Sequence, residues 1–136
     1  MKNFEVLEHT ADVGGKIYGK DIKELFINAT KLLYFLAGVT QYERMERVIS
    51  IELSSETIEE LLVKFLNELI YYMDVKKIGG DIKKIYIQKK GKIFNLDCEM
   101  AGEKISVKKE IKAATYHNLK VKREEGIFSS EIIFDI

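Results

Sequence analysis

The chain has 136 residues, of which 46% are hydrophobic and 32% are charged. That length predicts one domain over residues 1–136, and the hydrophobic content is too high for a disordered chain. Lys plus Arg and Asp plus Glu each number 22, so the formal net charge is zero. Proteins that bind nucleic acid mainly through phosphates carry a basic excess. A direct RNA-binding module is therefore the least favoured hypothesis, although a local basic patch stays open.

The composition also predicts where the protein works. Cys98 is the single cysteine, so an internal disulfide is impossible. The first eight residues carry Glu5 and Glu8 and lack the apolar run of a secretion signal. No stretch reaches the roughly 20 apolar residues needed to cross a bilayer. These features predict a cytoplasmic protein.

The first elements in chain order are two short strands, a loop and a helix. Residues 4–8 and 16–18 are extended in character, and the polar, glycine-rich residues 9–15 predict a loop between them. Asp21 stands at a helix N-cap position, and Gly38 at the left-handed position that ends a helix. Between them, apolar residues recur at helical spacing: Ile22, Leu25, Phe26, Ala29, Leu32, Leu33 and Leu36.

A strand at 48–53 and a second helix follow. This helix starts after a cap at Ser54, Ser55 or Thr57 and runs to about Asp74. Its apolar face is wide, which predicts that the helix is covered on more than one side. The apolar positions are Ile58, Leu61, Leu62, Phe65, Leu66, Leu69, Ile70 and Met73.

The remainder of the chain predicts β-structure. Residues 82–98 form a hairpin pattern around Lys90-Gly91-Lys92. Further strands are predicted at 105–115, 119–123 and 127–136. The expected fold is α+β, with two long helices packed on a mostly antiparallel β-sheet in a single domain.

The last residues are the first candidate for chemistry. Asp135 and Ile136 end the sequence inside a predicted strand, which places a carboxylate beside the terminal backbone oxygens. Those are hard oxygen ligands of the kind that Ca²⁺ and Mg²⁺ prefer. Asp12 would complete a three-sided oxygen cage if the two segments meet, and a cation or protons would relieve the repulsion. The alternative is that Asp135 ends a strand in solvent and Asp12 caps a turn.

The other reactive side chains carry weaker patterns. His9 could be a metal ligand or a general base, but without a partner of known geometry a structural hydrogen-bonding role in its loop is favoured. His117 and Cys98 lie far from it in sequence and make no zinc pattern, and Cys98 falls on the apolar side of its strand, where we expect it buried and inert. No glycine-rich phosphate loop or Ser-His-Asp order is present.

Five segments, in this order, resemble the archease family. They are Glu8-His9-Thr10-Ala11-Asp12-Val13-Gly14, Tyr18-Gly19-Lys20, Phe65-Leu66-Asn67-Glu68-Leu69-Ile70-Tyr71, Ile111-Lys112-Ala113-Ala114-Thr115-Tyr116-His117 and Phe134-Asp135-Ile136. The second helix motif has Phe where Trp is common, and Gly15 stands where an aliphatic residue is commoner. The resemblance spans nearly all of residues 1–136, which it identifies as one archease-like domain.

The resemblance implies a helper protein and not an enzyme. Archeases activate the RtcB-type RNA ligase that joins tRNA exon halves; they promote its guanylylation and turnover and can broaden its nucleotide triphosphate specificity. The family's metal site, described with Ca²⁺, maps onto Asp12, Asp135 and Ile136. Lys112 and His9 are further possible functional residues. The implied partner is the ligase protein, with tRNA contacted only indirectly and no membrane involved.

Two other functions stay open at this point. The first is a chaperone or modulator of a tRNA-modifying enzyme such as a methyltransferase, which the family resemblance also permits. The second is a small metal-dependent hydrolase that uses a cation held by Asp12 and Asp135, with His9 as the only evident general base.

Overall fold

A computed structural model of the chain describes residues 2–8 and 12–136. The strands are β1 (Phe4–Glu8), β2 (Asp12–Gly19), β3 (Thr40–Ser55), β4 (Ile78–Lys90), β5 (Ile93–Ser106), β6 (Ala113–Thr115), β7 (Lys122–Glu124) and β8 (Ile127–Asp135). The helices are α1 (Ile22–Ala37) and α2 (Ile58–Tyr71), and α2 continues into a single π-helical segment, η1 (Tyr72–Lys76).

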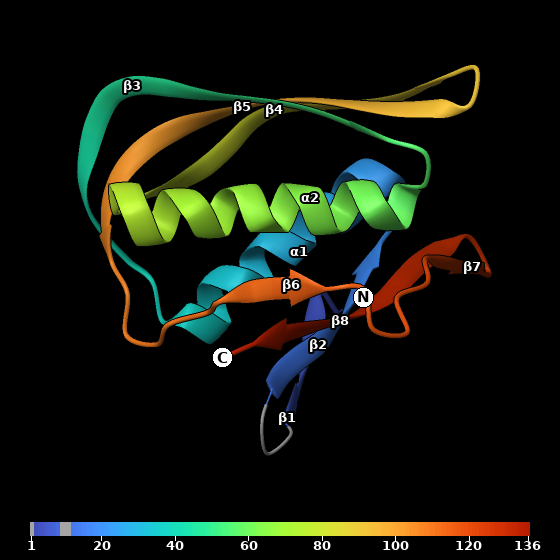
Figure 1. The fold of residues 1–136 in the computed structure, drawn as a ribbon, viewed down its shortest axis with the longest axis horizontal. Helices are drawn as coiled ribbons and strands as arrows, with labels where there is room; N and C mark the ends of the chain where they lie inside the picture. The colour runs from blue at the N-terminus through green and yellow to red at the C-terminus, as the bar shows by residue number, and fades with distance from the viewer. Residues whose placement is uncertain (1, 9–11) are drawn as a thin grey trace.

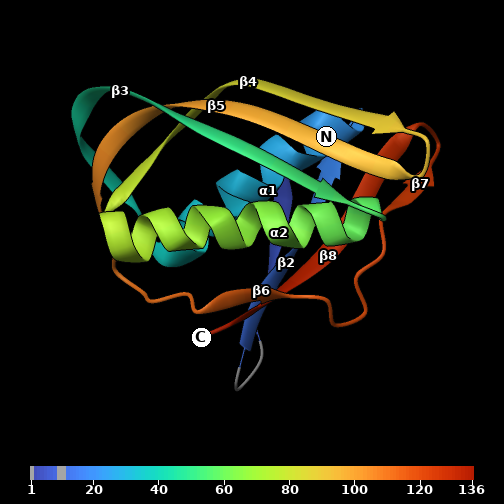
Figure 2. The same cartoon turned by 45° about the horizontal axis from the view of Figure 1, so that its top comes forward.

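Two antiparallel sheets enclose the helices. The first sheet has the order β1-β2-β8-β6, with β7 also paired to β8, and the second has the order β3-β5-β4. Both helices lie between the sheets (Figures 1 and 2), and each contacts strands of both. The hydrophobic core therefore fills two interfaces, one on either side of the helical layer.

The predicted architecture of two long helices packed on a sheet is wrong. Helix α1 has 16 residues and α2 has 14, whereas strands make up more than half of the described chain. The fold is α+β with two separate antiparallel sheets. Local periodicity indicates where a strand lies but not which strand it pairs with, so strands that belong to different sheets were merged into one.

The ends of both helices follow local signals. The Asp21 carboxylate accepts a hydrogen bond of 2.7 Å from the Glu24 N–H, and Gly38 has φ 63°, so both predicted ends of α1 are confirmed. Helix α2 is capped by Thr57, whose hydroxyl accepts a hydrogen bond of 3.0 Å from the Glu60 N–H. It ends at Tyr71 instead of about Asp74, because the chain widens into the π-helical segment.

The wide apolar face of α2 has the predicted consequence. Its buried residues include neighbours on the helical circumference such as Leu61, Leu62 and Val63, so no single side can take them all. The helix packs on β6 on one side and on β3 and β5 on the other. Coverage on more than one side is confirmed.

Several strand boundaries differ from the prediction, and the difference at β2 matters for the site. Asp12, Gly14 and Gly15 were expected in a loop but belong to β2. A Cβ at Gly14 would meet the backbone oxygen of Ile132, and one at Gly15 would lie 2.7 Å from a methyl of Leu32. The glycines therefore do not form a loop. They allow β2 to approach its neighbours closely.

The other strand predictions err in length. Strand β3 extends far beyond 48–53, and β5 continues to Ser106. In place of the predicted strands 105–115 and 119–123, the structure has the short strands β6 and β7, of three residues each. No helix in the described part of the chain is long and apolar enough to span a membrane.

Candidate functional site

Asp12 and Asp135, hereafter the acid pair, lie directly opposite each other. Strands β2 and β8 are antiparallel, and their register places Asp12 against Asp135. Opposed residues of an antiparallel pair project from the same side of the sheet, with Cβ atoms about 5 Å apart. Figures 1 and 2 both show the C-terminus beside the start of β2. The fold thus brings together Asp12, Asp135 and Ile136, three residues that the sequence nominated.

The acid pair places two acidic side chains opposite each other on neighbouring strands. Asp12 is half-buried, and its Oδ1 is buried with no hydrogen-bond partner in the part of the chain that the structure describes. Asp135 is exposed. The ion pairs found in residues 2–8 and 12–136 involve neither carboxylate. Opposed like charges destabilise a sheet, and an unpartnered buried oxygen costs free energy. A divalent cation is a group that would relieve both costs.

The acid pair alone is a sparse ligand set. Among the described residues, no cluster of three or more His, Cys, Asp or Glu side chains is placed to hold a metal ion. A cation here would need further oxygens, and the backbone of Ile136 is the nearest source along the chain. The donor types fit Ca²⁺ or Mg²⁺, and cation binding by Asp12, Asp135 and Ile136 stays a prediction.

Lys112 approaches the acid pair through its backbone. Its N–H donates a hydrogen bond of 2.8 Å to the main-chain oxygen of Asp135, while its side chain is exposed. The next residue, Ala113, pairs with Asp135 in the sheet. Lys112 therefore lies beside the acid pair, and a functional role for its side chain stays a prediction. His9 lies outside the described residues.

Asn67 is a site-supporting residue that the sequence analysis missed. From α2, its Oδ1 accepts a hydrogen bond of 2.7 Å from the Ala114 N–H, and its Nδ2 donates one of 3.3 Å to the Ala114 oxygen. The side chain thereby pairs with β6 as another strand would, and β6 in turn pairs with Asp135. The available signal was an amide inside the apolar stripe of a helix.

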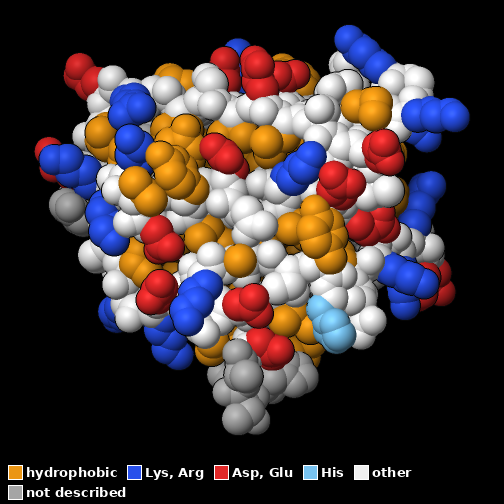
Figure 3. Space-filling model, viewed as in Figure 1, with side chains coloured by type: hydrophobic (Ala, Val, Ile, Leu, Met, Phe, Trp, Pro, Cys, Tyr) orange, Lys and Arg blue, Asp and Glu red, His pale blue; other side chains and the backbone are white. Residues whose placement is uncertain are grey.

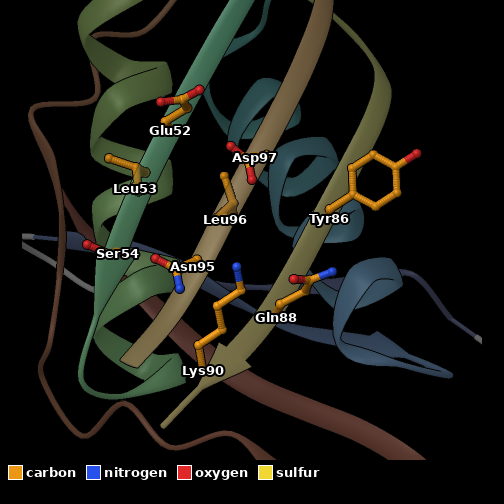
Figure 4. A pocket seen from close by; sticks show the side chains of 9 residues that line it. All are labelled: Glu52, Leu53, Ser54, Tyr86, Gln88, Lys90, Asn95, Leu96 and Asp97. Carbon is orange, nitrogen blue, oxygen red and sulfur yellow. The ribbon is translucent and has the colours of Figure 1, made fainter. Parts of the chain in front are cut away.

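A hollow on the second sheet holds no comparable chemistry. It has a volume of about 570 Å³ and lies on the outer face of β3, β4 and β5 (Figure 4). Its charged side chains are Glu52, Lys90 and Asp97, one from each strand.

Acidic and basic side chains are interspersed over the face of the molecule drawn in Figure 3. This face has no continuous basic surface for a polyanion.

Cys98 is not available as a nucleophile. Its side chain is 3% exposed, which confirms the prediction that it is buried. Burial raises the pKa of the thiol to about 12, and the neighbouring Glu99 carboxylate adds to the rise. The reactive thiolate is therefore scarce at neutral pH.

Comparison with known proteins identifies the family. The model of the archease protein family matches residues 4–136. The chain is 37% identical over 145 residues to protein archease of Pyrococcus furiosus, with 100% of both chains covered. It is 33% identical over 143 residues to protein archease of Pyrococcus abyssi, again with 100% of both covered. The chain belongs to the archease family.

Solved structures show that this archease shares its fold with relatives. The solution structure of Methanobacterium thermoautotrophicum protein 1598 matches with a TM-score of 0.78 and 31% identity, covering 100% of both chains. The crystal structure of an archease from Thermotoga maritima, described as a possible chaperone, matches with a TM-score of 0.67 and 26% identity. That match covers 96% of this chain and 94% of the other.

Proposed function

We propose that this archease activates an RtcB-type RNA ligase and catalyses no reaction itself. In this role it promotes guanylylation of the ligase, sustains ligase turnover and broadens the nucleotide triphosphates accepted. Its place is tRNA splicing in the cytoplasm, with the ligase as protein partner and tRNA contacted only through it. Family membership supports the proposal, and the observation that carries it is the pairing of Asp12 with Asp135.

The acid pair gives the proposal its physical content. Asp12, Asp135 and the backbone oxygens of Ile136 would hold a divalent cation, for which Ca²⁺ is the favoured candidate. The bound ion would supply positive charge that offsets the repulsion between the carboxylates. The chain's own contribution is to hold both carboxylates on paired strands at one end of the sheet. An activator must bind the reactive state of its partner better than the resting state, and the acid pair would supply a charged contact that makes that distinction.

The proposal is tested by ligase guanylylation with purified protein. Asp12→Ala and Asp135→Ala should each keep the fold and abolish stimulation, because each removes half of the acid pair. Asp97→Ala is the matched control, since Asp97 is an exposed carboxylate on the outer face of the second sheet. Normal stimulation by both acid-pair variants would refute the role proposed for the acid pair. No stimulation by the unaltered protein would refute the activator role.

A chaperone or modulator of a tRNA-modifying enzyme, such as a methyltransferase, is the second candidate. The description of the Thermotoga maritima relative as a possible chaperone favours it. A pull-down from the native cell distinguishes the two, because the main captured partner is a ligase in the first case and a modifying enzyme in the second.

A further inference from the structure

A second hollow opens beside the acid pair. Its volume is about 720 Å³, and it lies where the end of α1 meets β1, β2 and residues 108–111. Asp12 and Ile136 belong to its wall as well as to the candidate cation site. The volume lies within the range of about 300–1,000 Å³ that is typical of ligand pockets. We call it the anchor hollow.

The wall of the anchor hollow is largely apolar, and part of it is exposed. Phe35 is 64% exposed, Ile136 49% and Val6 36%, and Leu36 and Ile111 add further apolar surface. Phe35 is held on one side by Phe4, with ring centroids 5.4 Å apart. An aromatic side chain that is fixed in place yet exposed beside other apolar groups is typical of a protein contact surface.

The rim of the anchor hollow carries charges of both signs. Lys108 and Lys109 both line it, and their N–H groups donate hydrogen bonds of 2.9 and 3.0 Å to the Ala37 oxygen. The lysine backbone is thus fixed to the end of α1, while both side chains are exposed. Neither lysine joins an ion pair within the described ranges. Glu110 supplies negative charge next to Lys109 on the same segment, and Asp12 supplies it at another point of the rim.

We propose that the anchor hollow receives an apolar side chain of the protein partner, on a segment where an acidic residue adjoins that side chain. The apolar group would bury the exposed walls, and the acidic residue would face Lys108 and Lys109. This inference rests on the proposed function, because it assigns the docking surface for the same ligase. A second copy of the chain fits less well, since a two-fold contact here would bring two acid pairs into one interface.

The test is the kinetics of ligase binding by archease variants. Phe35→Ser should weaken affinity about tenfold or more, mainly through faster dissociation, because it removes an apolar contact. The double variant Lys108→Glu, Lys109→Glu should slow association and reduce its dependence on salt, because rim charges act on encounter. Tyr86→Ser is the control: Tyr86 is 59% exposed on the second sheet, and its loss should leave both rates unchanged.

The outcomes separate this inference from the function on which it rests. If Phe35→Ser leaves ligase dissociation unchanged, the anchor hollow is not the docking site. The proposed function would still stand in that case if Asp12→Ala abolishes activation. Self-association of the unaltered protein that Phe35→Ser abolishes, with ligase binding unchanged, would assign the hollow to a second copy instead. Absence of any ligase binding by the unaltered protein would overturn both.

Discussion

Replacing Asn67 by alanine tests how the fold supports the site. The substitution removes both hydrogen bonds between α2 and β6 and leaves the N–H and C=O of Ala114 without partners. Ala114 is 5% exposed, so water replaces those bonds poorly. Each net hydrogen bond contributes about 1 kcal/mol, and unpartnered buried groups raise the loss. We therefore expect the free energy of unfolding to fall by about 2–3 kcal/mol.

Thermal and urea unfolding followed by circular dichroism measure this loss. For a domain of this size, 1 kcal/mol corresponds to about 4 °C, so Asn67→Ala should lower the unfolding midpoint by about 8–12 °C. Ca²⁺ affinity should fall as well, because β6 is paired to Asp135. Asn95→Ala is the control, as this half-buried amide on β5 makes no side-chain hydrogen bond to the described residues. A change below about 0.5 kcal/mol for Asn67→Ala, the range of neutral surface substitutions, would refute the reasoning.

Two further predictions concern the core and strand β2. Cys98 should resist alkylation at pH 8 until the protein unfolds. Burial lifts its thiol pKa from 9.0 to about 12, so the unfolded chain ionises first as the pH rises. The contribution of Cys98 to the free energy of unfolding should therefore be constant below pH 9 and decline from pH 9 toward 12. Cys98→Ala should abolish that part of the decline. Gly15→Val should lower the free energy of unfolding by about 1–3 kcal/mol through overpacking against the backbone oxygen of Glu5 and the side chain of Leu32. An unfolding midpoint equal to that of the unaltered protein would show that β2 has room for a side chain.

Features governed by neighbouring residues were predictable from the sequence. The ends of α1 are set by Asp21 and Gly38, whose roles depend on backbone groups within a few residues. The hairpin turn at Gly91 is equally local, with φ 61°. The width of the apolar stripe on α2 predicted that the helix is enclosed, because exposed apolar surface on a second side would be costly.

Features that depend on distant segments were not predictable in the same way. The division into two sheets depends on strand pairing across the chain, which no local pattern reports. The sequence could nominate Asp12 and Asp135 by their chemistry, but their opposition follows from the register of β2 with β8. Asn67 and the anchor hollow have the same origin, since each needs segments far apart in sequence to meet.

Thermal unfolding with Ca²⁺ and with a chelator tests the central claim most directly. A ligand that binds only the folded state raises its stability, so Ca²⁺ should raise the unfolding midpoint of the unaltered protein and of the control Asp97→Asn. Asp12→Asn should lose that increase, yet in chelator be at least as stable as the unaltered protein, because it removes the charge opposite Asp135. An equal increase in Asp12→Asn, or none in the unaltered protein, would contradict cation binding by the acid pair.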